Sequence, residues 1–173
     1  MLGKLDDPAV VHLQEVIPTQ SVTTLFTWAT SCAAGCCLPL WHARRPDDGR
    51  ADALVDAARR YAAGACTKAQ LKGEIRAMRD AARELDAGAG DTAVEVACAR
   101  ALSTAAAVAT TPTSALGFVF YLVAAVAYDE LGAAADADAL DEAASRAIDC
   151  AARELDRVAV ADEPHPSNVD FSC

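Results

Sequence analysis

The chain has 173 residues, of which 53% are hydrophobic although only 5% are aromatic. Alanine is the largest single contributor to that apolar share, and it is the strongest helix former and a weak strand former. The composition therefore excludes a β-rich fold and predicts an all-α protein. The length suffices for one domain that buries roughly two-thirds of its unfolded surface without a metal or disulfide staple.

The net charge of −10 is concentrated near the C-terminus. Residues 1–128 contain 13 acidic and 12 basic residues, whereas residues 129–173 contain 12 acidic and 3 basic residues, a balance of −9. An acidic surface repels phosphate backbones and anionic lipids and attracts basic partners. We therefore expect neither a nucleic acid nor a membrane as partner. An equally weighted alternative is that the acidity only keeps an alanine-rich protein soluble.

Seven helical segments are expected in chain order. They cover about 7–16, 23–40, 50–63, 67–85, 92–110, 115–131 and 138–158. Together they predict a single bundle of six or seven helices over residues 1–159, packed through alanine, followed by an extended, partly mobile tail over 160–173. The apolar run Ala115–Tyr128 is shorter than the roughly 20 residues of a membrane span, so we expect a buried central helix there.

Several residues mark the ends of these helices. Thr67 with Gln70, and Thr92 with Glu95, have the spacing of capping boxes. Pro39 is expected to kink or close the second helix, because it cannot donate a backbone hydrogen bond. Gly64 and Gly132 mark the ends of the third and sixth helices, and Pro112 precedes the sixth helix.

We expect the cysteine side chains to pack in the core and not to bind a metal. Their number is odd, and the polar start of the chain does not resemble a secretory signal, so we expect reduced thiols and a cytoplasmic location. Cys32 and Cys36 share a helix face, with Cys37 and His42 nearby, but no second ligand pair matches them. We expect no metal and no other cofactor. The seven are Cys32, Cys36, Cys37, Cys66, Cys98, Cys150 and Cys173.

Neither catalysis nor nucleotide binding has a motif in this chain. The histidines His12, His42 and His165 lie in segments without a serine- or cysteine-centred motif. No glycine-rich phosphate loop occurs, since the AGAG stretch of residues 87–90 lacks the lysine and hydroxyl residue of such a loop. The sequence therefore favours a protein that is not an enzyme.

A basic stripe runs along the expected fourth helix, about 100° around from its apolar residues. Three interpretations are open: it binds an acidic partner, it pairs with the acidic seventh helix of the same chain, or it covers the edge of the core. Its members are Lys68, Lys72, Arg76, Arg79 and Arg83.

Residues 25–64 resemble the start of a helical immunity-protein family from bacterial polymorphic toxin systems. That family shows a Trp-Ala-x-x-Cys-Ala opening, a Leu-Pro-Leu-aromatic step, a Pro-(x)-Asp-x-Arg turn and an Ala-Ala-Arg-x-aromatic-Ala-x-Gly helix. The matching residues here are Trp28, Ala29, Cys32 and Ala33; Leu38, Pro39, Leu40 and Trp41; Pro46, Asp48 and Arg50; and Ala57, Ala58, Arg59, Tyr61, Ala62 and Gly64. The outline continues to about residue 130, although the histidines that relatives often carry in the later helices are absent.

The resemblance implies a protein that masks a cognate toxin by direct binding. A basic toxin would suit the acidic C-terminal segment. The partner-binding residues that we predict are Asp136, Asp138, Asp141, Glu142, Asp149 and Asp156.

Two other functions stay open. One is a small-molecule-binding protein or enzyme with a pocket between the alanine-rich helices, which a cavity lined by Cys32, Cys36 and several convergent polar groups would favour. The other is a homodimer or larger homo-oligomer, in which the basic stripe of one subunit docks on the acidic helix of another.

Overall fold

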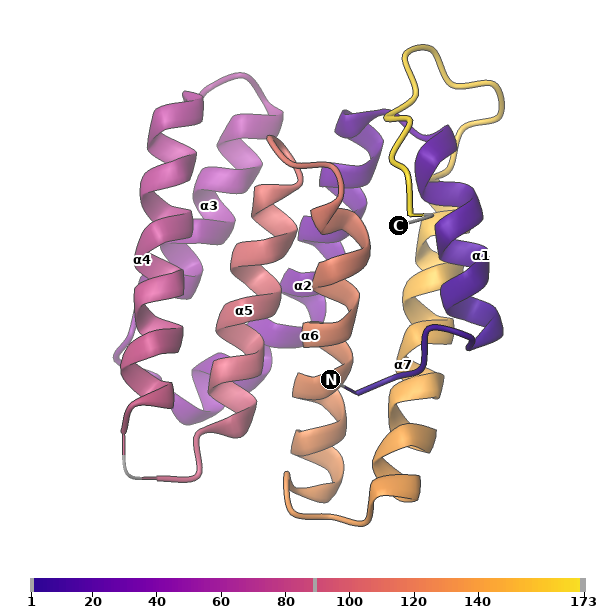
Figure 1. The fold of residues 1–173 in the computed structure, drawn as a ribbon. Helices are drawn as coiled ribbons and strands as arrows, with labels where there is room; N and C mark the ends of the chain where they lie inside the picture. Colours follow the sequence, from indigo (N-terminus) through magenta and orange to yellow (C-terminus); the bar gives the residue numbers. More distant parts are fainter. Residues whose placement is uncertain (1, 89, 172–173) are drawn as a thin grey trace.

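The structure is a computed structural model that describes residues 2–88 and 90–171 (Figure 1). Within these residues it contains seven α-helices and one short 3₁₀ helix, η1, and no strand. The all-α prediction is confirmed. The bounds are α1 Pro8–Val16, η1 Ile17–Thr19, α2 Val22–Arg44, α3 Arg50–Ala62, α4 Lys68–Asp86, α5 Ala93–Ala107, α6 Ser114–Leu131 and α7 Ala137–Val158.

The helices form a bundle with α5 and α6 near its middle (Figure 1). α5 packs against α2, α4 and α6, while α6 packs against α2, α5 and α7. α3 and α4 lie at one edge of the bundle, and α1 and α7 lie at the other (Figure 1). The two edges are therefore separated by the central helices.

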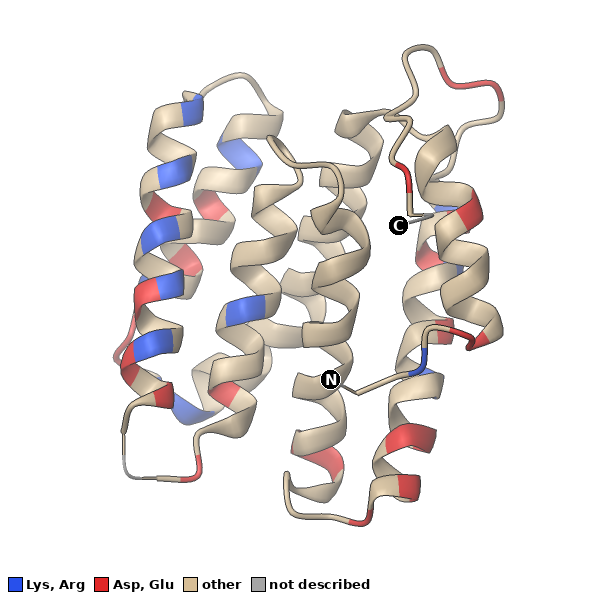
Figure 2. Cartoon of the chain, viewed as in Figure 1, with Lys and Arg blue, Asp and Glu red and all other residues tan. Residues whose placement is uncertain are grey.

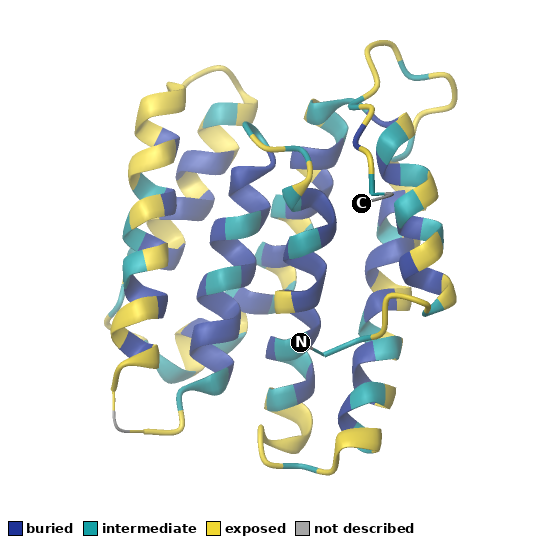
Figure 3. Cartoon of the chain, in the orientation of Figure 1, coloured by how far each residue is buried: buried dark blue, intermediate teal, exposed yellow. Residues whose placement is uncertain are grey.

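The small side chains of α5, most of them alanine, allow other helices to pack around it on several sides. Twelve of its residues are buried, and most of them are alanine or another small residue (Figure 3). A helix with short side chains all round lets neighbours approach closely on several sides, and close packing is what stabilises a protein interior. The core is thus narrow and dense around α5, as the alanine content predicts.

α6 is the helix that the sequence places at the centre. It buries larger side chains, among them Phe118, Phe120 and Leu122, between α5, α7 and α2. By length and hydropathy it is the one helix among the described residues that would also suit a membrane span, and half of that 18-residue window is buried within the bundle. The core helix of a compact protein has the same composition.

One of the two expected capping boxes is present. The Thr67 hydroxyl accepts the backbone N–H of Gln70 at 3.3 Å, and the Gln70 side chain accepts the N–H of Thr67 at 2.8 Å. The prediction for Thr92 and Glu95 is wrong. The Thr92 hydroxyl donates to the carbonyl of Leu85 at 3.1 Å, while Glu95 turns inward, with 8% of its surface exposed, toward the arginines at the end of α2.

Pro39 does not end its helix, because α2 continues to Arg44. The carbonyl of Gly35, four residues earlier, is left without the N–H that proline lacks. Both residues lie on the exposed side of α2, so water can bind that carbonyl. Gly64 adopts a left-handed backbone with φ of +72° after α3, as expected for a helix end.

Over residues 159–171, the part of the tail that the structure describes, the chain beyond α7 has no helix and is attached to the start of α2. Gln20, which is 3% exposed, accepts the N–H of Val160 with its side chain at 2.8 Å and the N–H of Ser167 with its carbonyl at 2.7 Å. The carboxylate of Glu163 accepts the backbone N–H of Ser21 at 2.6 Å. The sequence predicts an extended tail and none of these contacts. Asp162, His165 and Asn168 have positive φ values, so the backbone turns at these residues.

Candidate protein-binding site

The acidic side chains of α7 gather on one side of the helix. At 100° per residue, five of them fall within about 100° of one another around the helix axis. We call these five the acidic face: Asp138, Asp141, Glu142, Asp149 and Asp156. A neighbouring stripe that contains Leu140, Ile148 and Leu155 is buried against the bundle. Figure 2 shows the acidic residues along α7 and the tail, across the bundle from a basic edge on α4.

The N-terminal segment completes a hollow beside this face. α1 packs along α7, which brings the start of the chain next to the first turns of α7. The resulting hollow of about 490 Å³ is lined chiefly by carboxylates, and we call it the acidic hollow. Its charged residues are Lys4, Asp6, Asp7, Asp138, Asp141 and Glu142.

The acidic hollow is only partly neutralised. Lys4 Nζ lies 3.3 Å from Asp141 Oδ2, and Arg146 Nη1 lies 3.3 Å from Glu142 Oε1. The hydroxyl of Ser145 donates to the carboxylate of Asp7. Because several carboxylates surround one concave space, an ammonium or guanidinium group of a partner could contact more than one of them at once. The arrangement therefore suits a basic side chain from another protein.

The six predicted partner-binding residues do not all occupy this hollow. Asp136 caps α7, because its side chain accepts the N–H of Asp138 at 3.0 Å, and this is a structural role. Asp156 Oδ1 lies 2.8 Å from His12 Nε2. Asp149 is exposed and has no ion pair among the residues that the structure describes.

Two members of the hollow were missed by sequence reasoning. Asp6 and Asp7 are more than 130 residues away from α7 in the chain. Their signal in the sequence is local: Asp7 precedes Pro8, and its side chain caps α1 by accepting the N–H of Ala9 at 2.9 Å. That pattern locates the start of α1 but not the helix beside it.

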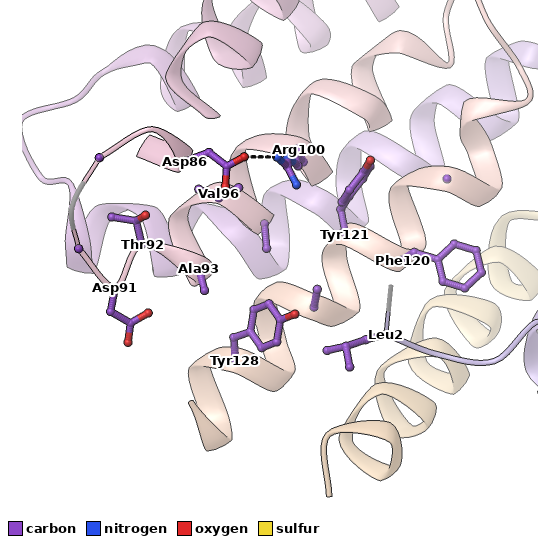
Figure 4. A pocket seen from close by; sticks show the side chains of 15 residues that line it. Leu2, Asp86, Asp91, Thr92, Ala93, Val96, Arg100, Phe120, Tyr121 and Tyr128 are labelled. Carbon is purple, nitrogen blue, oxygen red and sulfur yellow. Dashed lines mark hydrogen bonds and ion pairs between the residues drawn. The ribbon is translucent and has the colours of Figure 1, made fainter. Parts of the chain in front are cut away.

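A larger hollow opens on the other side of the N-terminal segment (Figure 4). It has about 670 Å³ and lies between α5 and α6, with Leu2 on one wall and Tyr121 and Tyr128 on another. Arg100 Nη2 binds Asp86 Oδ2 at 2.8 Å, and Tyr121 is 38% exposed. Tyrosine and arginine are over-represented at the energetic centres of protein interfaces. This aromatic hollow is therefore a second concave surface that suits a protein partner.

A third cavity, of about 350 Å³, lies beside the cysteines of α2 and α7. Cys32, Cys36 and Cys150 line it together with apolar residues, and only Ser31 and Glu154 are polar. Burial, helped by the neighbouring Cys36 thiol, raises the pKa of Cys32 to about 12, so this thiol stays protonated. The polar groups that a catalytic pocket needs do not converge here.

The buried cysteines behave as core residues. Cys37 is fully buried, and its hydrogen bond with Cys98, together with burial, raises the pKa of its thiol far above the usual value. Among the described residues the cysteines are free thiols, and no group of three or more His, Cys, Asp or Glu side chains could hold a metal ion. Cys173 lies outside the described residues.

The residues that carry the motifs stabilise the fold. Trp28 Nε1 donates to the carbonyl of Ala151 at 3.1 Å and so ties α2 to α7. Trp41 Nε1 donates to the carbonyl of Asp48 at 2.9 Å. The Asp48 carboxylate also pairs with Arg50 at 2.6 Å, and this hydrogen bond lowers the pKa of Asp48 below its usual value. These contacts fix the turn between α2 and α3.

A sequence profile of the family described as "Imm-5 like putative immunity protein" matches residues 15–156. The chain belongs to this family. The match extends from the end of α1 to the last turn of α7, so it includes the motif residues and the acidic face, whereas Asp6 and Asp7 precede it. The chain has no significant match among curated proteins or among solved structures.

Proposed function

We propose that this immunity-family protein neutralises a cognate toxin in the cytoplasm by binding it directly. The observation that carries the proposal is the acidic hollow, in which carboxylates from the N-terminal segment and from α7 converge on one space. The N-terminal segment contributes to both hollows, because Leu2 lines the aromatic hollow and Gly3 and Lys4 line the acidic hollow. Membership of the immunity family supports a toxin protein as the partner.

Electrostatics makes a basic toxin the best-matched partner. The acidic hollow carries five carboxylates and one ammonium group. Complementary charge accelerates encounter, while charged pairs at the rim contribute little to affinity. Affinity would then come mainly from the tyrosines and Arg100 in the aromatic hollow, which can be buried by a partner. A toxin that acts on nucleic acid has the basic surface that this arrangement requires.

The test is co-expression of the chain with the product of each neighbouring gene. We expect one neighbour to arrest growth alone, to be tolerated in the presence of this protein, and to co-elute with it. If no neighbour yields either a complex or protection, the proposal fails.

A pair of charge-reversed variants locates the surface. Asp138→Lys with Asp141→Lys reverses two charges of the acidic hollow and should weaken toxin binding. Asp47→Lys with Asp56→Lys makes the same change in net charge on exposed positions of the α2–α3 turn and of α3, and should leave binding unchanged. Equal weakening by both pairs would show that net charge, and not the acidic hollow, matters.

A further inference from the structure

The basic residues of α4 lie at the other edge of the bundle (Figure 2). Four of them border a hollow of their own. This basic hollow has about 500 Å³ and lies between α4 and the segment that follows α5. Four cationic side chains line it, together with two apolar and two hydroxyl-bearing positions. Its lining residues are Lys72, Ile75, Arg76, Arg79, Arg83, Ala107, Thr110 and Thr111.

Most of this positive charge is not neutralised within the chain. Arg83 pairs with Asp80, but Lys72, Arg76 and Arg79 have no carboxylate within 4.0 Å among the described residues. No carboxylate is found among the described residues that line the hollow. By contrast, the arginines at the end of α2 and in the α2–α3 turn all have acidic partners.

Pairing with the acidic helix of the same chain does not account for the stripe. α4 and α7 lie at opposite edges of the bundle, with α5 and α6 between them (Figure 1). The interpretation that these side chains cover the edge of the core explains only part of the basic stripe, because Lys72, Arg76 and Arg79 are exposed. Three like charges held on one helix repel one another, which costs free energy unless an anion binds between them.

We infer that the basic hollow binds a compact polyphosphate anion. Guanidinium groups match phosphate oxygens with paired N–H donors, and Arg76, Arg79 and Arg83 supply three of them. Thr111 is exposed and lines the same space, and its hydroxyl can donate a further hydrogen bond to an anion there. Ile75 and Ala107 form only a small apolar patch in the hollow, because they are 5% and 6% exposed.

A compact anion fits better than a nucleic-acid strand. The whole chain carries a net charge of −10, so its field repels a polyanion at long range. At physiological ionic strength this repulsion is screened beyond about 8 Å, and a ligand confined to the hollow experiences chiefly the local cations. A longer strand would extend past the hollow and past its positive charge.

The test uses isothermal titration calorimetry of the full chain with inorganic tripolyphosphate, with ATP and with a single-stranded oligonucleotide of about 12 nucleotides. We expect saturable one-to-one binding of tripolyphosphate that weakens as salt is raised. Tighter binding of ATP than of tripolyphosphate would show that the base contacts the apolar patch. Equal binding would show that only the phosphates are recognised. Binding of the oligonucleotide without tripolyphosphate, or of neither, would overturn the inference.

Variants connect the binding to the hollow. Arg76→Gln with Arg79→Gln should weaken tripolyphosphate binding by at least about tenfold, from the loss of two charges at near-contact distance. The matched control, Arg59→Gln with Arg153→Gln, removes two exposed arginines elsewhere and should change affinity less than about twofold. Thr111→Glu should also abolish binding, because it places a negative charge opposite the cations without removing any of them.

The inference is independent of the proposed toxin binding. The basic hollow lies across the bundle from the acidic face, so the α4 variants should still bind and neutralise the toxin (Figure 2). Far-ultraviolet circular dichroism verifies that each variant is folded. If the control pair weakens anion binding as much as the α4 pair, the hollow is not the site.

Discussion

Trp28 is the residue whose replacement most directly tests how α7, and with it the acidic face, is held to the bundle. It is 2% exposed, its indole N–H donates to the carbonyl of Ala151 in α7, and its ring meets Phe118 edge to face at 4.9 Å. Trp28→Phe retains an aromatic ring but removes the donor. The lost hydrogen bond costs about 1 kcal/mol. The smaller ring leaves about 40 Å³ unfilled, which at about 24 cal/mol per Å³ costs about 1 kcal/mol more.

We therefore expect Trp28→Phe to lower the free energy of unfolding by about 2 kcal/mol and the Tm by about 4–8 °C. Urea unfolding followed by circular dichroism at 222 nm measures this without relying on tryptophan fluorescence. The m-value should not change, because the surface exposed on unfolding is the same. Tyr121→Phe is the control, since it alters an exposed aromatic residue. A loss below about 0.5 kcal/mol at Trp28 would refute the importance of this contact.

Three further predictions concern the tail, the glycines and the thiols. Burial alone would raise the pKa of Glu163, but hydrogen bonds from α2 lower it. Glu163→Gln should therefore cost about 1 kcal/mol near pH 7, and the difference from wild type should disappear as the pH falls through the lowered pKa of Glu163. Gly64→Ala should destabilise by about 1 kcal/mol because of its positive φ, whereas Gly73→Ala, within α4 and facing open space, should stabilise by up to about 1 kcal/mol. Iodoacetamide at pH 8 should label exposed Cys150 before Cys32, whose pKa is raised, as mass spectrometry would show.

Each of these has an outcome that contradicts it. For Glu163, the difference from wild type would persist unchanged below pH 3 if the carboxylate charge were irrelevant to the tail contact. For the glycines, equal changes in unfolding free energy at both positions would mean that backbone conformation does not distinguish them. For the thiols, simultaneous labelling of Cys32 and Cys150 would contradict the burial of Cys32.

The sequence predicts the helices well because their signals are local. Hydrophobic spacing, together with end signals at α3, α4 and α6, located α3, α4, α6 and α7 to within a few residues. The prediction of a helix cap was wrong where a side chain with the spacing of a cap instead contacts a residue far away in the sequence. Glu95 has the spacing to cap α5, but in the folded chain its carboxylate lies 3.6 Å from Arg45 and 4.0 Å from Arg44, away from the start of the helix.

The candidate site was predicted only in part for the same reason. Charge asymmetry identified the acidic residues of α7, since it can be read along one segment, whereas the sequence analysis did not predict that five of them share one face. The acidic hollow requires α1 to lie against α7, and the aromatic hollow requires α5 beside α6 with Leu2 across the opening. No periodicity within a helix specifies which other helix it packs against, so Asp6, Asp7 and Tyr121 could not be assigned to a surface.

The separation of the charged edges also bears on self-association. If the basic stripe of one copy docked on the acidic face of another, the pair would still present one unused basic edge and one unused acidic edge. Such a heterologous contact does not close into a dimer and instead extends into chains whose length grows with concentration. The contacts would be exposed ion pairs, which contribute about 1 kcal/mol or less each and are weakened by salt. A compact, salt-resistant dimer would therefore have to use a different surface, and the aromatic hollow between α5 and α6 is the concave surface that could supply one.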